Sequence, residues 1–201
     1  MSDATDPGDP GHDAYLAEGN ARQARKRVAA DALIRDHQGQ LLLVRPTYKA
    51  GWDLPGGMSE GNEEPLITVY RELDEELGLG DVGIQGLLCL DWVAPHGPWD
   101  DLLAFVFDGG ELSATQIEQL APRDAELSGY GFFEAGEALH MLPARQSRRA
   151  DQALRALSDG IVRYLRNGIP AWPVPGGSER QSPADGAEDS ERAVCEFLPY
   201  I

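Results

Sequence analysis

The strongest constraint on the fold is a helical pattern in residues 65–77. Apolar side chains recur there at positions i, i+4, i+7 and i+11, which lie on one face of an α-helix. These side chains are Leu66, Tyr70, Leu73 and Leu77. We expect this helix to begin near Glu64 and Pro65, because proline suits a first turn, and Gly78 and Gly80 to stop it. The segment therefore predicts an amphipathic helix whose apolar face packs against the rest of a folded domain.

The same helix carries three glutamates, Glu72, Glu75 and Glu76, at positions i, i+3 and i+4. Their carboxylates project from one face, where like charges repel by roughly a few tenths of a kcal/mol per pair. An isolated pattern of this kind is most often a solvated acidic surface. Here residues 56–57 are a Gly-Gly pair, where bare backbone can approach a ligand closely, and Glu63 adds a fourth carboxylate. Carboxylates held on a rigid helix suit a hard divalent cation such as Mg²⁺.

This segment resembles the Nudix hydrolase family. The family signature is G-x5-E-x7-R-E-U-x-E-E-x-G-U, where U is a bulky aliphatic residue, and residues 57–79 match every defined position without a gap. The matching residues are Gly57, Glu63, Arg71, Glu72, Leu73, Glu75, Glu76, Gly78 and Leu79. A match of this length is a specific signal, unlike a lone glycine-rich loop.

The resemblance implies a hydrolase that depends on Mg²⁺ or Mn²⁺ and cleaves a nucleoside diphosphate linked to another moiety. Glu72, Glu75 and Glu76 would be catalytic residues and metal ligands, with the Gly57 carbonyl as a further ligand. The chemistry agrees with these residue types, because cations neutralise a diphosphate and make a bound water more acidic. The segment contains no nucleophile beside a partner base, so we expect direct attack by water and no covalent intermediate.

The resemblance also assigns supporting roles within and outside the signature. Glu63 would support the metal site, and Arg71 would hold a carboxylate of the signature. Family members often recruit a further acid from a late loop as general base, and Glu126 is the candidate here, with Asp124 in reserve. Pro95 lies 16 residues after the signature, a distance associated in this family with ADP-ribose hydrolases.

Basic and aromatic residues near the signature are the candidates for substrate binding. Arg45 and Trp52 are close enough in sequence to meet a phosphate and a base, respectively. Lys49 is interpreted as surface charge. The three arginines that open the last predicted helix are interpreted as a solvated face; they are Arg145, Arg148 and Arg149.

Composition limits the partners of this chain. There are 17 Lys and Arg residues against 34 Asp and Glu residues, a net charge of −17 that would repel a polyanion. We therefore expect a small-molecule nucleotide substrate and no general nucleic-acid binding, and the charge weighs against RNA cap hydrolysis. No apolar run reaches the roughly 20 residues that span a membrane, and no secretory signal is visible, so a cytoplasmic location is expected. A homodimer remains open.

The chain reads as one domain with two tails. Residues 1–25 form an acidic, partly disordered arm with a helix over 15–26, residues 26–167 form the domain, and residues 168–201 form a flexible Gly/Pro-rich acidic tail. Within the domain the pattern predicts a hairpin, the carboxylate helix, further strands and a last helix. The strands are expected at 28–35, 40–45, 82–93, 102–107 and 130–133, and the last helix at 143–166. This order predicts an α+β fold, an α/β/α sandwich with a mixed sheet, as the Nudix resemblance also implies.

Three functions fit these observations. The first is cleavage of a nucleoside diphosphate linked to another moiety, with ADP-ribose or another nucleotide sugar as the first guess. The second is hydrolysis of a nucleoside triphosphate, normal or oxidised, to a monophosphate and pyrophosphate. The third, disfavoured because no carboxylate of the signature is missing, is a sensor that binds nucleotides without turnover.

Overall fold

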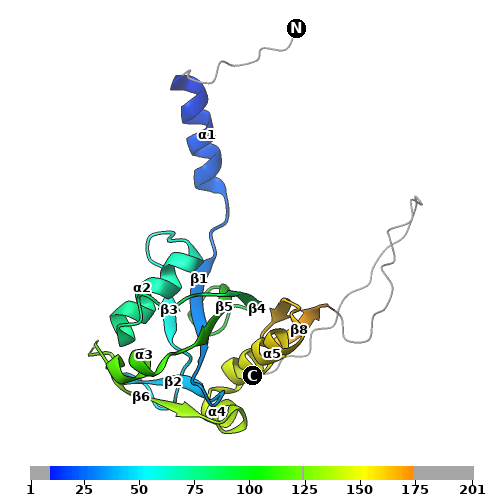
Figure 1. Ribbon diagram of the computed structural model, residues 1–201. Coiled ribbons are helices and arrows are strands. Elements are labelled where there is room, and N and C mark those ends of the chain that lie inside the picture. The colour runs from blue at the N-terminus through cyan, green and yellow to red at the C-terminus, as the bar shows by residue number, and fades with distance from the viewer. Residues whose placement is uncertain (1–9, 124, 174–201) are drawn as a thin grey trace, which may run out of the picture.

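A computed structural model describes residues 10–123 and 125–173. Its centre is a mixed sheet with the strand order β6-β2-β1-β5-β4-β7-β8, and β3 pairs separately with β1 (Figure 1). The β1–β5 and β4–β7 pairs are parallel, and the other pairs are antiparallel. The strands are β1 (Arg27–Arg35), β2 (Leu41–Pro46), β3 (Gly56–Met58), β4 (Gly86–Val93), β5 (Leu102–Glu111), β6 (Leu127–Phe133), β7 (Arg163–Arg166) and β8 (Ile169–Trp172).

Helices cover both faces of this sheet. One apolar cluster lies between the sheet and α2, and a second lies between the sheet and α5. The helices are α1 (Pro10–Arg22), α2 (Pro65–Leu77), α3 (Ala114–Gln119), α4 (Ala135–Met141) and α5 (Ala144–Asp159). The predicted α/β/α sandwich with a mixed sheet is therefore confirmed.

The central strands supply both apolar clusters because side chains along a strand point alternately to its two faces. In β1, Ala32 and Ile34 belong to the cluster under α2, whereas Leu33 belongs to the cluster under α5. In β2, Leu42 and Leu43 divide in the same way. Burial on both faces explains why these strands read as continuous apolar runs.

The elements around the signature follow the sequence closely. β1 and β2 form the predicted antiparallel hairpin. α2 begins at Pro65 and ends at Leu77, and the following Gly78 has a φ of 74°, a left-handed conformation that glycine adopts without strain. The strand predicted at 82–93 begins later, at Gly86, whereas β5 and β6 are longer than predicted.

The last predicted helix is wrong at its C-terminal end. α5 ends at Asp159 because Gly160 adopts a φ of 71°. Ile161 is exposed, and Leu165 is buried in β7 beside β4, so their helical spacing with the α5 residues was coincidental.

The ends of the described chain also differ from expectation. The N-terminal helix occupies Pro10–Arg22 rather than residues 15–26, and it extends away from the sheet (Figure 1). The segment expected to be a flexible tail from residue 168 begins with β8, which pairs with β7 at the edge of the sheet. The rest of that tail, from residue 174, lies outside the described residues. Among the helices of the described part, none is long and apolar enough to cross a bilayer.

Candidate active site

The candidate site lies where α2 faces the short strand β3. Val69, Leu73 and Leu77 are buried on one side of α2 and anchor it to the sheet. The carboxylates of the signature occupy other positions around the helix, so the apolar packing fixes the helix that carries them. β3 pairs with β1, which fixes the glycine backbone that approaches these carboxylates.

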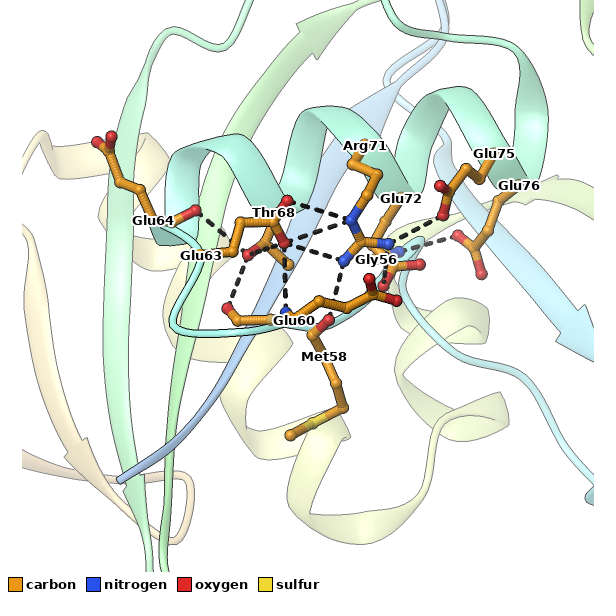
Figure 2. A network of polar contacts seen from close by, with 11 residues as sticks. Gly56, Met58, Glu60, Glu63, Glu64, Thr68, Arg71, Glu72, Glu75 and Glu76 are labelled. Atoms are coloured by element: carbon orange, nitrogen blue, oxygen red, sulfur yellow. Dashed lines mark hydrogen bonds and ion pairs between the residues drawn. The ribbon is translucent and has the colours of Figure 1, made fainter. Parts of the chain in front are cut away.

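Arg71 is the centre of a polar network along α2 (Figure 2). Its guanidinium donates to Glu63 at 3.0 Å and to Glu75 at 2.9 Å, and it lies 3.2 Å from Glu72. It also donates to the Met58 carbonyl at 3.0 Å, which joins α2 to β3. One guanidinium thus contacts and orients three carboxylates of the signature, although its single positive charge offsets only part of theirs.

The entrance of the helix holds Glu63 in place. The Thr68 hydroxyl donates to the Glu63 carboxylate at 2.9 Å, and Ser59 Oγ lies 2.7 Å from the same hydroxyl. Hydrogen bonds from Arg71, followed by that from Thr68, hold the pKa of Glu63 below its usual value. Glu63 is therefore an ionised residue with its orientation set by neighbours.

Glu72 packs directly against Gly57. A Cβ added at residue 57 would lie 2.5 Å from Glu72 Cδ and 2.8 Å from Oε2, which only glycine avoids. Burial raises the pKa of Glu72, and the neighbouring charges of Glu75 and Glu126 add to this, while Arg71 opposes it. The contact places the Gly57 backbone beside Glu72. The family signature implies both groups as metal ligands.

Glu76 faces the other side of the site. Its carboxylate accepts a hydrogen bond of 3.0 Å from the Gly56 backbone N–H. Burial raises the pKa of Glu76 to about 8, with further contributions from the charges of Glu72, Asp31 and Asp53. A carboxylate with this environment gains stability in its charged form from a nearby cation.

Glu76 and both glycines border a cavity of about 480 Å³. This volume lies in the range of small-molecule sites in proteins. The lining comes from β1, β2, the loop before β3, β3 itself, the end of α2, the facing ends of β4 and β5, and the start of α5. The lining residues include Ala29, Asp31, Val44, Pro46, Tyr48, Lys49, Asp53, Leu54, Gly56, Gly57, Met58, Glu76, Val93, Leu102, Pro143, Arg145, Gln146 and Arg149.

A buried ionic network supports the cavity wall on the α5 side. Arg149 Nε donates to Asp91 at 3.1 Å, and Nη1 donates to Asp31 at 3.3 Å. Asp91 is fully buried and also accepts from the Gly168 N–H at 3.0 Å. Burial raises the pKa of Asp31 to about 6, more than the charge of Arg149 lowers it.

This network corrects the interpretation of the arginines on α5. Arg149 is buried rather than solvated, because two aspartates from β1 and β4 neutralise it. Arg145 borders the cavity. Arg148 is exposed, as expected, and donates to the Asn167 carbonyl at 3.0 Å.

The two candidates for the general base, Glu126 and Asp124, lie outside the signature. Glu126 is exposed, and its charge contributes to the raised pKa of Tyr48 and of Glu72, after burial as the main cause. Its backbone carbonyl accepts a hydrogen bond of 2.7 Å from the Thr47 N–H. The reserve candidate, Asp124, lies outside the described residues.

Arg45 and Trp52 do not border the cavity among the described residues. Arg45 is exposed and alternates along β2 with Val44 and Pro46, which do line the cavity. Trp52 is half-buried and packs edge-on against Phe133, with ring centroids 4.9 Å apart. Lys49, interpreted as surface charge, instead borders the cavity and pairs with Asp53 at 2.5 Å.

The residues fit a divalent cation by their chemistry. Carboxylate oxygens, which are hard ligands, lie beside the Gly57 backbone. The charges of Glu72, Asp31 and Asp53 raise the pKa of Glu76, a repulsion that a cation would relieve. Within residues 10–123 and 125–173, however, no three acidic, histidine or cysteine side chains already converge as a ligand set. Binding of one ion by Glu72, Glu75 and Glu76 would therefore require these side chains to change their orientation.

Three charged residues of the cavity were not predicted from the sequence. Asp31 is a lone acid within an apolar strand, and Arg149 precedes Ala153 and Ala156 at the spacing of a buried helix face. Both are signals of buried charges that need partners. Asp53 gave no such signal, because it occupies a loop where polar residues are ordinary.

Comparisons with known proteins agree with this geometry. A sequence model of the NUDIX domain matches residues 25–157. An RNA pyrophosphohydrolase of Halorhodospira halophila is 41% identical over 56 residues, covering 27% of this chain and 31% of that protein. The CMP-5'-(N-acetyl-N-hydroxy-3-aminopropyl)phosphonate hydrolase of Streptomyces rubellomurinus is 33% identical over 64 residues, covering 30% of this chain and 31% of that protein. The chain thus spans about a third of the length of these two relatives.

Solved structures share the fold over a longer stretch. The MutT protein of Methanosarcina mazei aligns with a TM-score of 0.54 and 25% identity, covering 69% of this chain and 99% of that one. The NUDIX domain of Shewanella oneidensis NrtR, solved with ADP ribose, aligns with a TM-score of 0.57 and 22% identity, covering 72% and 97%. Because the family model matches residues 25–157, which is most of the chain, this chain belongs to the Nudix family.

Proposed function

We propose that this protein is a Mg²⁺- or Mn²⁺-dependent pyrophosphohydrolase that cleaves the diphosphate of a nucleotide linked to another moiety. The observation that carries the proposal is the position of Glu76, a carboxylate of the signature that also borders the cavity beside Gly56 and Gly57. One carboxylate of the signature is therefore part of the cavity wall.

Glu72, Glu75, Glu76 and the Gly57 carbonyl would hold the cation. When bound, it would neutralise the diphosphate and acidify a water molecule. Arg71 orients the carboxylates and reduces the electrostatic repulsion between them in the absence of a bound cation. Glu126 is the candidate acceptor for the proton of the attacking water, supported by its electrostatic influence on Glu72.

The cavity supports a small substrate. Its volume suits a nucleotide, and Arg145 and Lys49 place positive charge in a wall otherwise rich in carboxylates. The Streptomyces relative is named for hydrolysis of CMP linked to a phosphonate, which is a nucleotide linked to another moiety. We therefore keep nucleotide sugars, with ADP-ribose first, as the leading substrate class.

A triphosphate substrate is the second candidate, favoured by the relatives named RNA pyrophosphohydrolase. It would use the same carboxylates. The net charge of −17 opposes a long RNA, so a free nucleoside triphosphate is the more favourable form of this candidate.

The experiment compares wild type with Glu76→Gln, which removes charge at nearly constant size. Purified proteins are assayed with Mg²⁺ against ADP-ribose, other nucleotide sugars, normal and oxidised nucleoside triphosphates, and a 5′-triphosphorylated RNA oligonucleotide. Anion-exchange chromatography identifies the products. AMP with ribose 5-phosphate supports the first proposal, whereas a monophosphate with pyrophosphate supports the second.

The metal and the site are tested in the same assay. Activity should disappear with EDTA and return with Mg²⁺ or Mn²⁺, and Glu76→Gln should lose most turnover while remaining folded, with an unfolding temperature no lower than that of wild type. Full activity in EDTA would refute the metal-dependent mechanism, and full activity of Glu76→Gln would refute the site.

A further inference from the structure

Two buried hydrogen-bond acceptors in the cavity walls have no partner among the described residues. They are Asp53 Oδ1 and Gln146 Oε1, and both residues border the cavity. Asp53 is 8% exposed, so bulk water does not serve its carboxylate freely. A buried acceptor without a donor is costly, and each such group in a folded protein requires an explanation.

The two acceptors stand on rigid supports. The Asp53 backbone exchanges two hydrogen bonds with Val44, of 2.9 and 3.0 Å, and Lys49 binds its other carboxylate oxygen. Gln146 lies in the first turns of α5, which Arg149 ties to β1 and β4. Neither residue is therefore free to satisfy its acceptor by a large backbone movement.

The same cavity also has apolar surface. Val44, Pro46, Leu54 and Tyr48 contribute to its lining together with the polar and charged residues. Apolar side chains combined with a few fixed polar groups are typical of pockets that orient a small-molecule ligand. Because both unpartnered atoms are acceptors, the group that completes them must donate hydrogen bonds.

We propose that this part of the cavity binds a nucleobase with an exocyclic amino group, and that Asp53 and Gln146 determine that preference. The proposal rests on the proposed function, because it takes a nucleotide as the substrate. Adenine, guanine and cytosine present amino hydrogens that the two acceptors can receive. Uracil carries a carbonyl oxygen where cytosine carries its exocyclic amino group, so at that position an acceptor would face the Asp53 carboxylate.

The first experiment measures kcat/KM for the glucose conjugates of ADP, GDP, CDP and UDP with Mg²⁺. Wild type should process at least one amino-bearing conjugate about tenfold or more better than the uridine conjugate. Gln146→Leu should reduce this preference to about threefold or less, chiefly through KM. Asp53→Asn should improve the uridine conjugate relative to the others, because the new amide can donate to a carbonyl.

Gln152→Leu is the matched control, since it makes the same change on the same helix outside the cavity lining. It should leave the base preference unchanged. A reversed preference in Asp53→Asn is a result that simple destabilisation would not produce, so it separates recognition from folding. Equal processing of all four conjugates by wild type, or a preference that survives both cavity substitutions, would overturn the proposal.

A second measurement does not depend on hydrolysis. Calorimetry in EDTA measures binding of AMP, GMP, CMP and UMP to wild type, Gln146→Leu and Gln152→Leu. Tighter binding of an amino-bearing nucleotide than of UMP, lost only in Gln146→Leu, would support the proposal even if no conjugate were cleaved and the hydrolase function failed. Equal or absent binding of all four would overturn the recognition proposal, whatever the hydrolysis assay gives.

Discussion

The carboxylate of Glu72 rests on the Cα face of Gly57, at a distance that leaves no room for a Cβ atom. The atoms in the way belong to the far end of a flexible side chain, not to the backbone. The φ of Gly57 is not in the left-handed region, so another residue could adopt this backbone. The glycine is therefore required by the position of a carboxylate rather than by the path of the chain.

Gly57→Ala should consequently remove activity without unfolding the protein. The added methyl group would push the Glu72 carboxylate away from the Gly57 backbone, separating two of the expected metal ligands. We expect kcat to fall about tenfold or more, as happens when an orienting contact in a metal site is lost. The measurement is steady-state kinetics together with a thermal unfolding curve, which should stay close to that of wild type.

The neighbouring glycine provides the contrast. Gly56 has a φ of 134°, and a Cβ there would collide with the backbone of Ala30 and Asp31. Gly56→Ala should therefore lower the unfolding temperature clearly. Similar stability losses in the two variants would contradict the assignment of Gly57 to the site.

Arg71→Ala should weaken metal binding more than it weakens the fold. Removing the guanidinium releases Glu63, Glu72 and Glu75 from the partner that orients them. We expect the Mg²⁺ concentration for half-maximal activity to rise about tenfold or more, the usual effect of losing an orienting partner. A Mg²⁺ titration of activity checks this.

Arg155→Ala is the control for Arg71, because Arg155 is an exposed arginine that also pairs with an acid four residues away, Asp151. It should leave the Mg²⁺ titration unchanged. An unchanged titration in Arg71→Ala itself would mean that the carboxylates need no such alignment.

Because the pKa of Glu76 is raised, the free energy of unfolding should depend on pH when no divalent cation is present. The Glu76 pKa of about 8 in the folded protein exceeds the usual value of 4.5, so the folded state binds more protons than the unfolded state between these values. Stability in EDTA should therefore fall as pH rises from about 5 to 8, by up to about 1.4 kcal/mol per pH unit. Asp31, with a pKa raised to about 6, adds to the fall only at the lower end of this range.

Urea denaturation in EDTA at pH 5.5, 6.5, 7.5 and 8.5 measures this profile. Glu76→Gln should show a shallower fall and exceed wild type at pH 8.5, because it has no charge to bury. Mg²⁺ should stabilise wild type more at pH 8 than at pH 6, since the ionised carboxylate binds the cation. Parallel profiles for wild type and Glu76→Gln would refute the raised pKa.

The sequence predicted those helices and strands whose formation depends on residues close together in the chain. The apolar stripe of α2, Pro65 at its start and Gly78 at its end act within a few residues, and the helix was predicted almost to the residue. The end of α5 was missed because Leu165 continues the helical spacing while pairing with β4 in a strand. That choice depends on a distant partner, which periodicity does not reveal.

The same division holds for the site. The network of Arg71 with Glu63, Glu72 and Glu75 lies within one contiguous segment, so helical spacing together with the family resemblance indicated that these residues lie close together. The far wall of the cavity combines Asp31, Asp53 and Gln146 from three separate segments. Their proximity arises from sheet pairing and from the packing of α5, so only the folded structure brings them together.

Arg149 and Arg148 are adjacent in sequence and should respond oppositely to the same substitution. Arg149 is buried between Asp31 and Asp91, whereas Arg148 is exposed and bonds a backbone carbonyl. Arg149→Met would leave two buried carboxylates without their cation, a change that costs about 3–5 kcal/mol in comparable cases. Arg148→Met should cost much less. Urea denaturation at pH 7 compares the two variants.

Adding Asp91→Asn to Arg149→Met distinguishes lost charge compensation from lost packing. The neutral amide removes one uncompensated charge, and its oxygen can still accept from the Gly168 N–H. The double variant should therefore be more stable than Arg149→Met alone, although each substitution by itself destabilises. Additive losses would show instead that Arg149 acts by filling space between α5 and the sheet, because independent sites add and coupled charges do not.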